Sequence, residues 1–328
     1  MVQRSRALGT GMCVPTQVIT NEDLARIVDT SDDWIVTRTG MKERRRVQPD
    51  QAASDLAVPA ALQAIEESGV SPRELDAIIV ATVTSDMLFP STSCIIQDRI
   101  GARNIPAFDV SAGCTGAIYA LSLADQMIRG GKFRNILVVG VEVLTKITNW
   151  TDRSTCVLFG DAAGAIVLGP SDRDDHGILG FHLASDGRGG HTLRMPAGGS
   201  RMPANHETVE KRMHTLYMRG NEIFKTAINM MSESCNILTE QAGMKPRDVD
   251  LLVFHQANLR IIEAVGKRLH LPNEKVFVNI HKYGNTSSAS TLLAIHEARE
   301  AGRLHRGSLM LQVAFGAGLT WGGILWKW

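Results

Sequence analysis

The chain contains an internal repeat, and this repeat restricts the possible folds more than any other feature of the sequence. The segment Pro72-Arg73-Glu74-Leu75-Asp76 precedes a short apolar run, Ala77 to Ala81. A similar segment, Pro246-Arg247-Asp248-Val249-Asp250, precedes a second run, Leu251 to Phe254, and Asp76 and Asp250 are 174 positions apart. Such a correspondence predicts two copies of one structural unit.

The similarity continues downstream of both segments. In each copy a helix-like stretch with paired isoleucines is followed by two further strand-like runs, at nearly the same offset. Because strands and helices alternate, the pattern predicts an α/β fold built from two similar halves. The predicted pairs are the isoleucines at 95–96 and 261–262, the second strands at Pro106–Val110 and Val276–Ile280, and the third strands at Ile136–Gly140 and Leu309–Val313.

The predicted strands are apolar throughout, which is typical of strands covered on both faces. We therefore expect the halves to pack together, with a boundary in the polar stretch Ser171–Asp175. This gives units 1–170 and 171–328. The site is expected where the strand-to-helix turns of both halves converge, and segment 185–215, rich in Gly, Arg, His and Met, is expected to be an irregular excursion beside it.

Composition narrows the class of protein. The 328 residues are 44% hydrophobic and 21% charged, with a net charge of +1, which favours a globular enzyme and argues against general nucleic-acid binding. The five cysteines are odd in number and lack metal-ligand spacing, so a disulfide scaffold and a metal site are not expected. No apolar stretch reaches the length of a membrane span, and no signal core follows the N-terminus. We expect a cytoplasmic protein.

One cysteine stands out by its position. Cys114 follows the predicted strand Pro106–Val110 and precedes a stretch with helical spacing that ends at Gly130-Gly131. It is therefore predicted at a strand-to-helix turn, where free N–H groups and the helix dipole favour a thiolate. An isolated cysteine is more often a small core residue, but this position favours a nucleophile.

Two polar residues occupy turns in the second half. His255 directly follows the strand Leu251–Phe254, and Asn285 lies in the small-residue run Gly284-Asn285-Thr286-Ser287, 171 positions after Cys114. Alone, they would be a hydrogen-bonded histidine and a helix N-cap. Near a cysteine they supply a proton acceptor and an oxyanion donor. The turn Phe315–Gly318 is either a tight connection or a source of a backbone N–H donor.

Together these residues resemble a known family, the β-ketoacyl-acyl-carrier-protein synthases III, which start type II fatty acid synthesis. The resemblance extends over nearly the whole chain. Its motifs are Thr30–Gly40 (TSDDWIVTRTG), the cysteine turn, Gly160–Ala165 (GDAAGA), Gly220–Lys225 (GNEIFK), His255–Arg260 (HQANLR), Gly284–Ser287 (GNTS) and Phe315–Gly322 (FGAGLTWG).

The resemblance implies a thiolase-like, duplicated αβαβα layered fold and a homodimer. It implies a catalytic triad of Cys114, His255 and Asn285, with backbone oxyanion donors at Cys114 and Ala317. The sequence also differs from the common family pattern in two places. Ala317 replaces a common glycine, and Gly113-Cys114-Thr115-Gly116-Ala117 replaces the common Ala-Cys-Ala-Gly-Phe.

The resemblance also implies substrates and partners. An acyl-CoA primer would acylate Cys114, and malonyl-acyl carrier protein would then condense with it, without a cofactor or metal. Phe89 corresponds to a position that crosses the dimer interface and closes the acyl pocket, which favours acetyl-CoA. The implied coenzyme A contacts are Trp34, Arg38, Arg153 and Asn258. Lys225 corresponds to a basic position beside the pocket in the family. The spacing of Arg260, Lys267 and Arg268 places them on one face of a predicted helix, which is either a solvated face or, as we expect, a surface that attracts the acidic carrier protein together with Lys225.

Three alternatives remain at this stage. A related enzyme of polyketide, quinolone or biotin-precursor synthesis would carry the same triad. A cysteine hydrolase would pass the acyl group to water, but Trp34 and Arg38 favour coenzyme A. A non-catalytic acyl-binding subunit would not need all three polar residues.

Overall fold

A computed structural model describes residues 4–328, and its architecture consists of two five-stranded sheets with the same strand order. The first sheet has the order β1-β7-β6-β4-β5 and the second β8-β14-β13-β11-β12. In each sheet the last three strands are parallel to one another, and the second strand of the order pairs antiparallel with both of its neighbours. Strand bounds are β1 Ser5–Cys13, β4 Ala77–Ala81, β5 Ala107–Val110, β6 Ile136–Val143, β7 Asp161–Pro170, β8 Gly177–Ser185, β11 Leu251–Phe254, β12 Val276–Phe277, β13 Leu309–Gly316 and β14 Thr320–Lys327.

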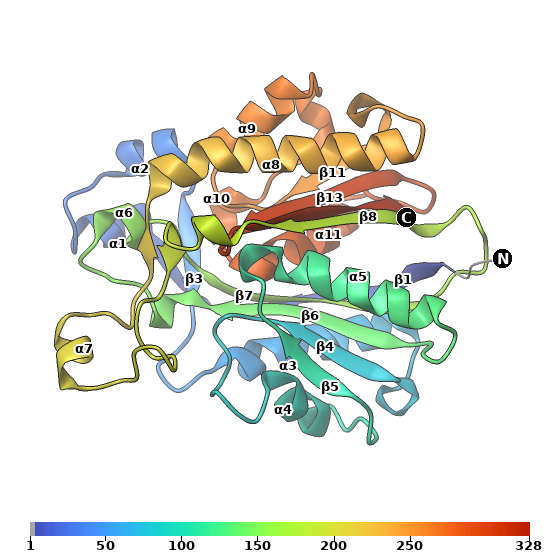
Figure 1. The fold of residues 1–328 in the computed structure, drawn as a ribbon, viewed down its shortest axis with the longest axis horizontal. Helices are drawn as coiled ribbons and strands as arrows, with labels where there is room; N and C mark the ends of the chain where they lie inside the picture. Colours follow the sequence, from blue (N-terminus) through green and yellow to red (C-terminus); the bar gives the residue numbers. More distant parts are fainter. Residues whose placement is uncertain (1–3) are drawn as a thin grey trace.

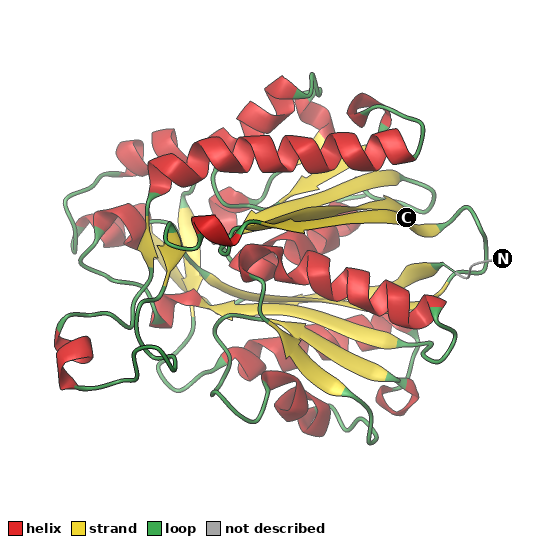
Figure 2. Ribbon diagram, in the orientation of Figure 1, coloured by secondary structure: helices red, strands yellow, loops and turns green. Residues whose placement is uncertain are grey.

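Helices cover both sheets and fill the space between them (Figure 1). Two helices lie between the sheets, two pack on the outer face of the first sheet, and two on the outer face of the second. The result is the five-layer αβαβα arrangement that was predicted, visible as alternating helix and strand layers in Figure 2. The inner helices are α5 Gly116–Arg129 and α11 Ser290–Glu300, and the outer ones are α3 Ala53–Ser68, α4 Thr92–Arg99, α8 Gly220–Gln241 and α9 Leu259–Arg268.

The inner layer explains the apolar strands. Residues of α5 and α11 share one core with residues of both sheets, and the strands β4, β6, β11 and β13 are buried along their whole length. All strands of the first sheet precede residue 171, and all strands of the second follow residue 176. The division into units 1–170 and 171–328 is consistent with this arrangement and stays a prediction.

The two strand-to-helix turns are equivalent, and their offset is the one predicted from Asp76 and Asp250. The turn Gly113–Thr115 leads into α5 at Gly116, and Ser287–Ala289 leads into α11 at Ser290. Both turns are 174 positions apart, so Cys114 corresponds to Ser288. Asn285 lies three residues before the position that matches Cys114, at the start of the second turn. Gly113 and Ser287 both have left-handed backbones, with φ of 56° and 47°.

One strand is shorter than predicted. Val276–Ile280 was expected to be a strand, but β12 ends at Phe277 and a short helix, α10 (Ile280–Tyr283), follows. The Gln256 side chain accepts hydrogen bonds from the backbone N–H groups of Asn279 and Ile280, at 3.0 and 3.2 Å. These bonds satisfy the backbone without a sheet partner, and the strand ends.

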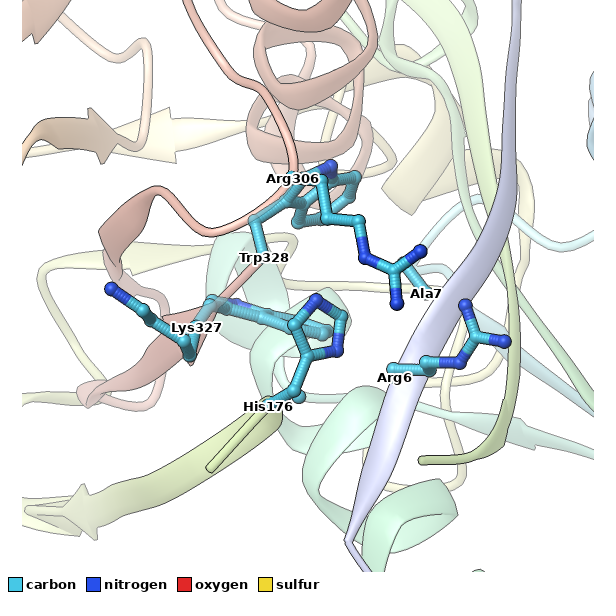
Figure 3. A pocket seen from close by; sticks show the side chains of 8 residues that line it. Arg6, Ala7, His176, Arg306, Lys327 and Trp328 are labelled. Atoms are coloured by element: carbon cyan, nitrogen blue, oxygen red, sulfur yellow. The ribbon is translucent and has the colours of Figure 1, made fainter. Parts of the chain in front are cut away.

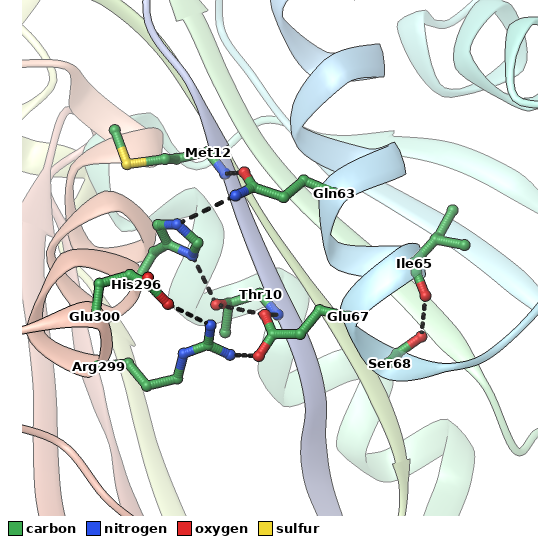
Figure 4. Close-up of polar contacts among 9 residues, drawn as sticks. All are labelled: Thr10, Met12, Gln63, Ile65, Glu67, Ser68, His296, Arg299 and Glu300. Atoms are coloured by element: carbon green, nitrogen blue, oxygen red, sulfur yellow. Dashed lines mark hydrogen bonds and ion pairs between the residues drawn. The ribbon is translucent and has the colours of Figure 1, made fainter. Parts of the chain in front are cut away.

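Polar contacts also join the halves (Figure 4). His296 of α11 lies 2.8 Å from Thr10 of β1, measured from Nδ1 to Oγ1. Arg299 of the same helix pairs with Glu67 of α3, which also accepts a hydrogen bond from the Thr10 N–H. The second half is thus anchored to β1 and to an outer helix of the first.

Smaller elements cover one end of the layers. A two-stranded antiparallel sheet of β2 and β3 and a core that includes Ile35, Met41 and Phe159 hold them together. The stretch 185–215 is largely irregular, as expected. The remaining elements are α1 Asn21–Ala25, α2 Asp32–Thr39, β2 Gln17–Thr20, β3 Glu43–Arg46, α6 Arg153–Cys156, β9 Leu193–Arg194, α7 His206–Glu210 and β10 Tyr217–Met218.

Candidate active site

Cys114 lies in the turn between β5 and α5, as predicted, and the C-terminal hairpin packs directly against it. A Cβ atom at Gly316 would lie 2.6 Å from the Cys114 nitrogen, and one at Gly113 would lie 2.8 Å from the Ala317 nitrogen. Only residues without a side chain allow the two backbones to approach this closely. The N–H groups of Cys114 and Ala317 are thereby brought to one place. Thr115, a departure from the family pattern, supports the contact through Thr320, with 3.0 Å between the hydroxyls.

The Cys114 thiol is buried, and this overturns one expectation. The residue is 9% exposed, and burial raises the pKa of Cys114 to about 12, against the opposing effect of the neighbouring Ser287 hydroxyl; an ionised Glu142 would also raise this pKa. The prediction that the helix N-terminus stabilises a resting thiolate is therefore wrong. Loss of water around the sulfur disfavours the charged form, and Cys114 rests as a thiol.

His255 follows β11 and is held by one strong contact. Its Nδ1 lies 2.6 Å from the Ser290 hydroxyl, and the ring of Phe315 packs against it with centroids 5.7 Å apart. Burial lowers the pKa of His255 to about 3, so the imidazole is neutral near pH 7. Because Nδ1 is engaged with Ser290, Nε2 is the nitrogen available to a reactant.

Asn285 is fixed by its backbone and by its own side chain. Its N–H donates to Leu158 and its carbonyl accepts from Gly160, at 2.8 and 3.0 Å. Its Oδ1 accepts from the Ser287 N–H at 2.9 Å. That bond leaves the Asn285 Nδ2 group as the donor that can face a ligand.

The structure brings the three predicted catalytic residues to one cavity. Cys114, His255 and Asn285 line a cavity of about 90 Å³, together with Phe315 and Gly316. A second, apolar cavity of about 180 Å³ also reaches Cys114 and Ala317. Its walls include Leu193, Met195 and Leu216, so the irregular excursion lies beside the site, as expected.

A wide cleft of about 540 Å³ lies next to these cavities, and three of the four predicted coenzyme A residues, Trp34, Arg38 and Asn258, line it. Trp34, at the start of α2, is flanked by two guanidinium groups, Arg38 at 4.7 Å and Arg153 at 4.8 Å from its ring centroid. Asn258 caps α9 and donates to the Arg38 carbonyl at 3.1 Å. An aromatic ring flanked by two cations is suited to a ligand with a purine ring and phosphates.

The predicted carrier-protein residues form two groups. Lys225 and Arg260 line the cleft, and Arg260 also stacks over Phe224, 5.6 Å from its ring centroid. Lys267 and Arg268 lie at the far end of α9, about 10–12 Å along the helix. Arg268 pairs with Asn229 of α8 and lines a separate groove.

Phe89 does not line the cavity of its own chain. Its side chain is 83% exposed and that of the adjacent Leu88 is 86% exposed, in the loop between β4 and α4. Val83, at the start of the same loop, does line the apolar cavity.

Sequence reasoning missed two groups at the site. Ser290, the partner of His255, belongs to the run Asn285–Ser290, which is polar except for Ala289 and is buried throughout. Glu142 is fully buried on β6 next to the cysteine turn. An acid in the run Ile136–Val143, otherwise without polar side chains, was the available signal, but the predicted strand ended at Gly140.

A further cavity, of about 140 Å³, lies near the start of β1 and the end of β14 (Figure 3). Arg6, His176 and Arg306 line it, and the Asp172 carboxylate lies 3.8 and 3.6 Å from the two arginines. It contains none of the predicted site residues. Within residues 4–328, no group of three or more His, Cys, Asp or Glu side chains is placed to hold a metal ion, and no helix is long and apolar enough to cross a membrane.

Two matching layered halves, with a cysteine facing a histidine and an asparagine, define a condensing enzyme of the thiolase-like fold. Residues 108–187 and 239–328 match the family models described as 3-oxoacyl-[acyl-carrier-protein (ACP)] synthase III and its C-terminal domain. The chain is 55% identical to the β-ketoacyl-[acyl-carrier-protein] synthase III of Caldanaerobacter subterraneus subsp. tengcongensis, over 98% of this chain and 97% of that protein.

Solved structures agree with this result. The 3-oxoacyl-[acyl-carrier-protein] synthase III of Aquifex aeolicus has a TM-score of 0.91 at 46% identity, with 99% of this chain and 100% of that chain covered. The corresponding enzyme of Thermus thermophilus also gives 0.91, at 44% identity and 98% and 99% coverage. The chain belongs to the β-ketoacyl-acyl-carrier-protein synthase III family, whose members are condensing acyltransferases that initiate fatty acid synthesis.

Proposed function

We propose that this enzyme condenses a short acyl-CoA primer, best represented by acetyl-CoA, with malonyl-acyl carrier protein through an acyl group on Cys114. The observation that carries the proposal is that Cys114, His255 and Asn285 line one common cavity. The proposal requires no metal or cofactor.

In the first half-reaction, the Cys114 sulfur attacks the carbonyl of the acyl-CoA thioester. Because the thiol rests protonated, a neutral His255 must accept its proton at Nε2 as the S–C bond forms. The oxyanion accepts hydrogen bonds from the N–H groups of Cys114 and Ala317. The intermediate collapses, coenzyme A leaves as a thiolate and takes the proton back from His255.

In the second half-reaction, the malonyl thioester carbonyl accepts hydrogen bonds from His255 Nε2–H and Asn285 Nδ2. These donors stabilise the enolate that forms as carbon dioxide leaves. The enolate carbon attacks the acyl-cysteine, and the Cys114 thiolate is expelled as the β-ketoacyl thioester forms. The thiolate then takes up one proton from the solvent, which restores the resting thiol. Between the two half-reactions the neutral His255 ring changes tautomer through exchange with the solvent, from a proton on Nδ1 to a proton on Nε2. The Ser290 hydroxyl is suited to both states because it can donate to Nδ1 or accept from Nδ1–H.

The surrounding residues supply binding. The Trp34 ring between Arg38 and Arg153 would hold the nucleotide of coenzyme A, with Asn258 beside it. Lys225 and Arg260 at the cleft, with Lys267 and Arg268 further along α9, would attract an acidic carrier protein. The exposed Leu88–Phe89 loop would pack against a second copy, so that Phe89 closes the partner's acyl pocket in a homodimer. The five free cysteines favour a reducing, cytoplasmic location.

The test is acylation followed by intact mass spectrometry. Wild-type protein incubated with acetyl-CoA should gain one acetyl group, and Cys114→Ala should gain none. The matched control is Cys94→Ala, which removes an exposed cysteine and should acylate normally. Acylation of Cys156 or Cys235 in the Cys114→Ala protein would contradict the assignment. Release of free acid would instead indicate a hydrolase, and no reaction would indicate a non-catalytic binder.

A further inference from the structure

A fully buried acid, Glu142, lies beside the proposed nucleophile, and the mechanism above does not use it. Its carboxyl group projects from β6 into a set of hydrogen-bonding groups from the loop after β4 and the turn before α11. The contacts to Oε2 come from the Thr84 hydroxyl (2.7 Å), the Val83 N–H (3.1 Å) and the Thr82 hydroxyl (3.5 Å), and those to Oε1 from the hydroxyls of Ser288 (3.0 Å) and Ser287 (3.1 Å) and the Val83 N–H (3.3 Å).

The proton count around Ser288 conflicts with an ionised Glu142. The Ser288 oxygen lies 2.9 Å from the Ala81 carbonyl oxygen and 3.0 Å from Glu142 Oε1. A hydroxyl has one proton, and a carbonyl can only accept. If Glu142 is ionised, the Ser288 proton can serve only one of these two contacts, and the other brings two oxygen atoms within 3.0 Å with no proton between them. If Glu142 carries a proton on Oε1, it donates to Ser288, and Ser288 donates to Ala81.

A second buried acid, Asp161, accepts hydrogen bonds from donors that have no competing acceptor. Asp161 accepts from the Val47 N–H, the Thr145 N–H and the Thr145 hydroxyl, at 2.9, 2.9 and 2.5 Å. Neither Val47 nor Thr145 presents a competing acceptor in these contacts, so an ionised carboxylate satisfies them. Asp161 is therefore a matched control for a buried acid that does not need a proton.

Ser287 connects Glu142 to the proposed active site. Its hydroxyl lies 3.1 Å from Glu142 Oε1, its N–H holds Asn285 Oδ1, and its side chain lines the apolar cavity beside Cys114. Its left-handed backbone, with φ of 47°, is unusual for a residue other than glycine. Its single proton can go to Glu142 or to the Cys114 sulfur, but not to both.

We propose that Glu142 is held as a neutral carboxylic acid and acts as a positioning residue, donating to Ser288 and leaving the Ser287 hydroxyl free to donate to the Cys114 sulfur. No proton leaves Glu142 during the reaction. The role for Cys114 rests on the function proposed above, whereas the protonation of Glu142 does not.

The titratable groups around Glu142 are consistent with a neutral carboxylic acid at this position. Burial raises the pKa of Glu142 to about 7, while the hydrogen bonds from Thr84, Val83, Ser288 and Ser287 lower it. Among the described groups, Cys114 responds to the Glu142 charge, which raises its pKa. The other titratable groups on neighbouring elements have their own partners: Asp161 on β7, Asp86 after β4 with Ser54, and His255 after β11 with Ser290.

The first experiment detects the proton directly. Infrared spectra of the wild-type protein slightly below pH 7 should contain the carbonyl stretch of a protonated carboxylic acid. The band should disappear in Glu142→Gln and persist in Asp161→Asn. A wild-type protein without the band, or a band that survives in Glu142→Gln, would overturn the proposal, whatever the role of Cys114.

The second experiment measures alkylation of Cys114 by iodoacetamide as a function of pH, with the site identified by peptide mass spectrometry. Gln resembles the neutral acid, so Glu142→Gln and wild type should react at equal rates below pH 7. Above pH 7, Glu142 ionises in the wild type and its charge disfavours the Cys114 thiolate. The curve of alkylation rate against pH should therefore lie about 1 pH unit higher for the wild type than for Glu142→Gln. Faster reaction of the variant at every pH would mean that Glu142 is always ionised. Identical profiles throughout would mean that Glu142 and Cys114 do not interact.

The route through Ser287 is tested by Ser287→Gly, which removes the hydroxyl and suits the left-handed backbone. In that background, part of the pH difference caused by Glu142→Gln should be lost. An undiminished difference would overturn the route through Ser287 and leave a direct charge effect. Failure of Cys114 to react in any variant, with the infrared band present, would count against the proposed nucleophile and not against the state of Glu142.

Discussion

Substitution of Gly316 by alanine tests whether the close approach of the terminal hairpin to Cys114 creates the oxyanion site. The new Cβ would lie 2.6 Å from the Cys114 nitrogen and 3.1 Å from the Thr115 nitrogen. Both are backbone atoms, so no side-chain rotation can relieve the contact. The backbone of Gly316 is not left-handed, so alanine adds steric overlap without a conformational penalty.

Two effects should follow from this overlap. Overpacking of a tight site costs about 1–3 kcal/mol of folding free energy, which should lower the midpoint of thermal unfolding. Displacement of the Ala317 N–H should remove one oxyanion donor and slow acylation by about 10²–10³-fold. The acylation rate is measured by intact mass spectrometry with acetyl-CoA, and stability by thermal unfolding.

The matched control is Gly266→Ala on α9, where a Cβ meets no atom within 4 Å. Alanine there should stabilise the helix by up to about 1 kcal/mol and leave acylation unchanged. If Gly316→Ala kept both the wild-type midpoint and the wild-type acylation rate, the reasoning about this contact would be refuted.

Four further outcomes are expected. Trp34→Ala should raise KM for acetyl-CoA by about 5–10-fold, because two cation–π contacts lose their ring, while kcat changes little; a selective loss of kcat would contradict nucleotide binding. Phe89→Thr should admit longer primers in a chain-length assay, and an unchanged preference would place the end of the pocket elsewhere. Arg260→Glu should weaken the malonyl-carrier step at low salt and spare acylation, whereas equal losses in both half-reactions would indicate a structural role. Because burial lowers the pKa of His255 to about 3, the unfolded state binds the extra proton below about pH 6.5, so stability should fall as the pH drops from there, and less steeply in His255→Gln.

The layered fold could be predicted because its buried strands can be recognised in the sequence as short runs of apolar residues. Ala77–Ala81 and Leu251–Phe254 match the observed strands to the residue, since runs buried on both faces consist only of apolar residues. The strand predicted at Val276–Ile280 could not be corrected from sequence, because it ends where the Gln256 side chain replaces a sheet partner. That side chain comes from another part of the chain.

The positions of the site residues could be predicted, but their protonation could not. Cys114, His255 and Asn285 lie at turns that glycines and small residues indicate. The pKa of Cys114 depends on how completely the second half excludes water from the turn, which is a property of the packed molecule. Glu142 shows the same limit, since its partners come from residues 82–84 and 287–288 and are assembled only by folding.

The duplication explains why the site is asymmetric although the fold is not. The turns before α5 and α11 contact each other, because both helices pack between the sheets. Equivalent positions of the two turns therefore lie on opposite sides of the contact between the halves. They can carry different side chains with different roles. In one turn Gly113 takes the left-handed position and brings Cys114 against the terminal hairpin. In the other, Ser287 takes that position at a conformational cost of about 1–2 kcal/mol, and its N–H and hydroxyl then serve Asn285 and Glu142. A glycine would avoid the cost but would lose the hydroxyl, so the strained serine is best understood as a functional residue of the second turn.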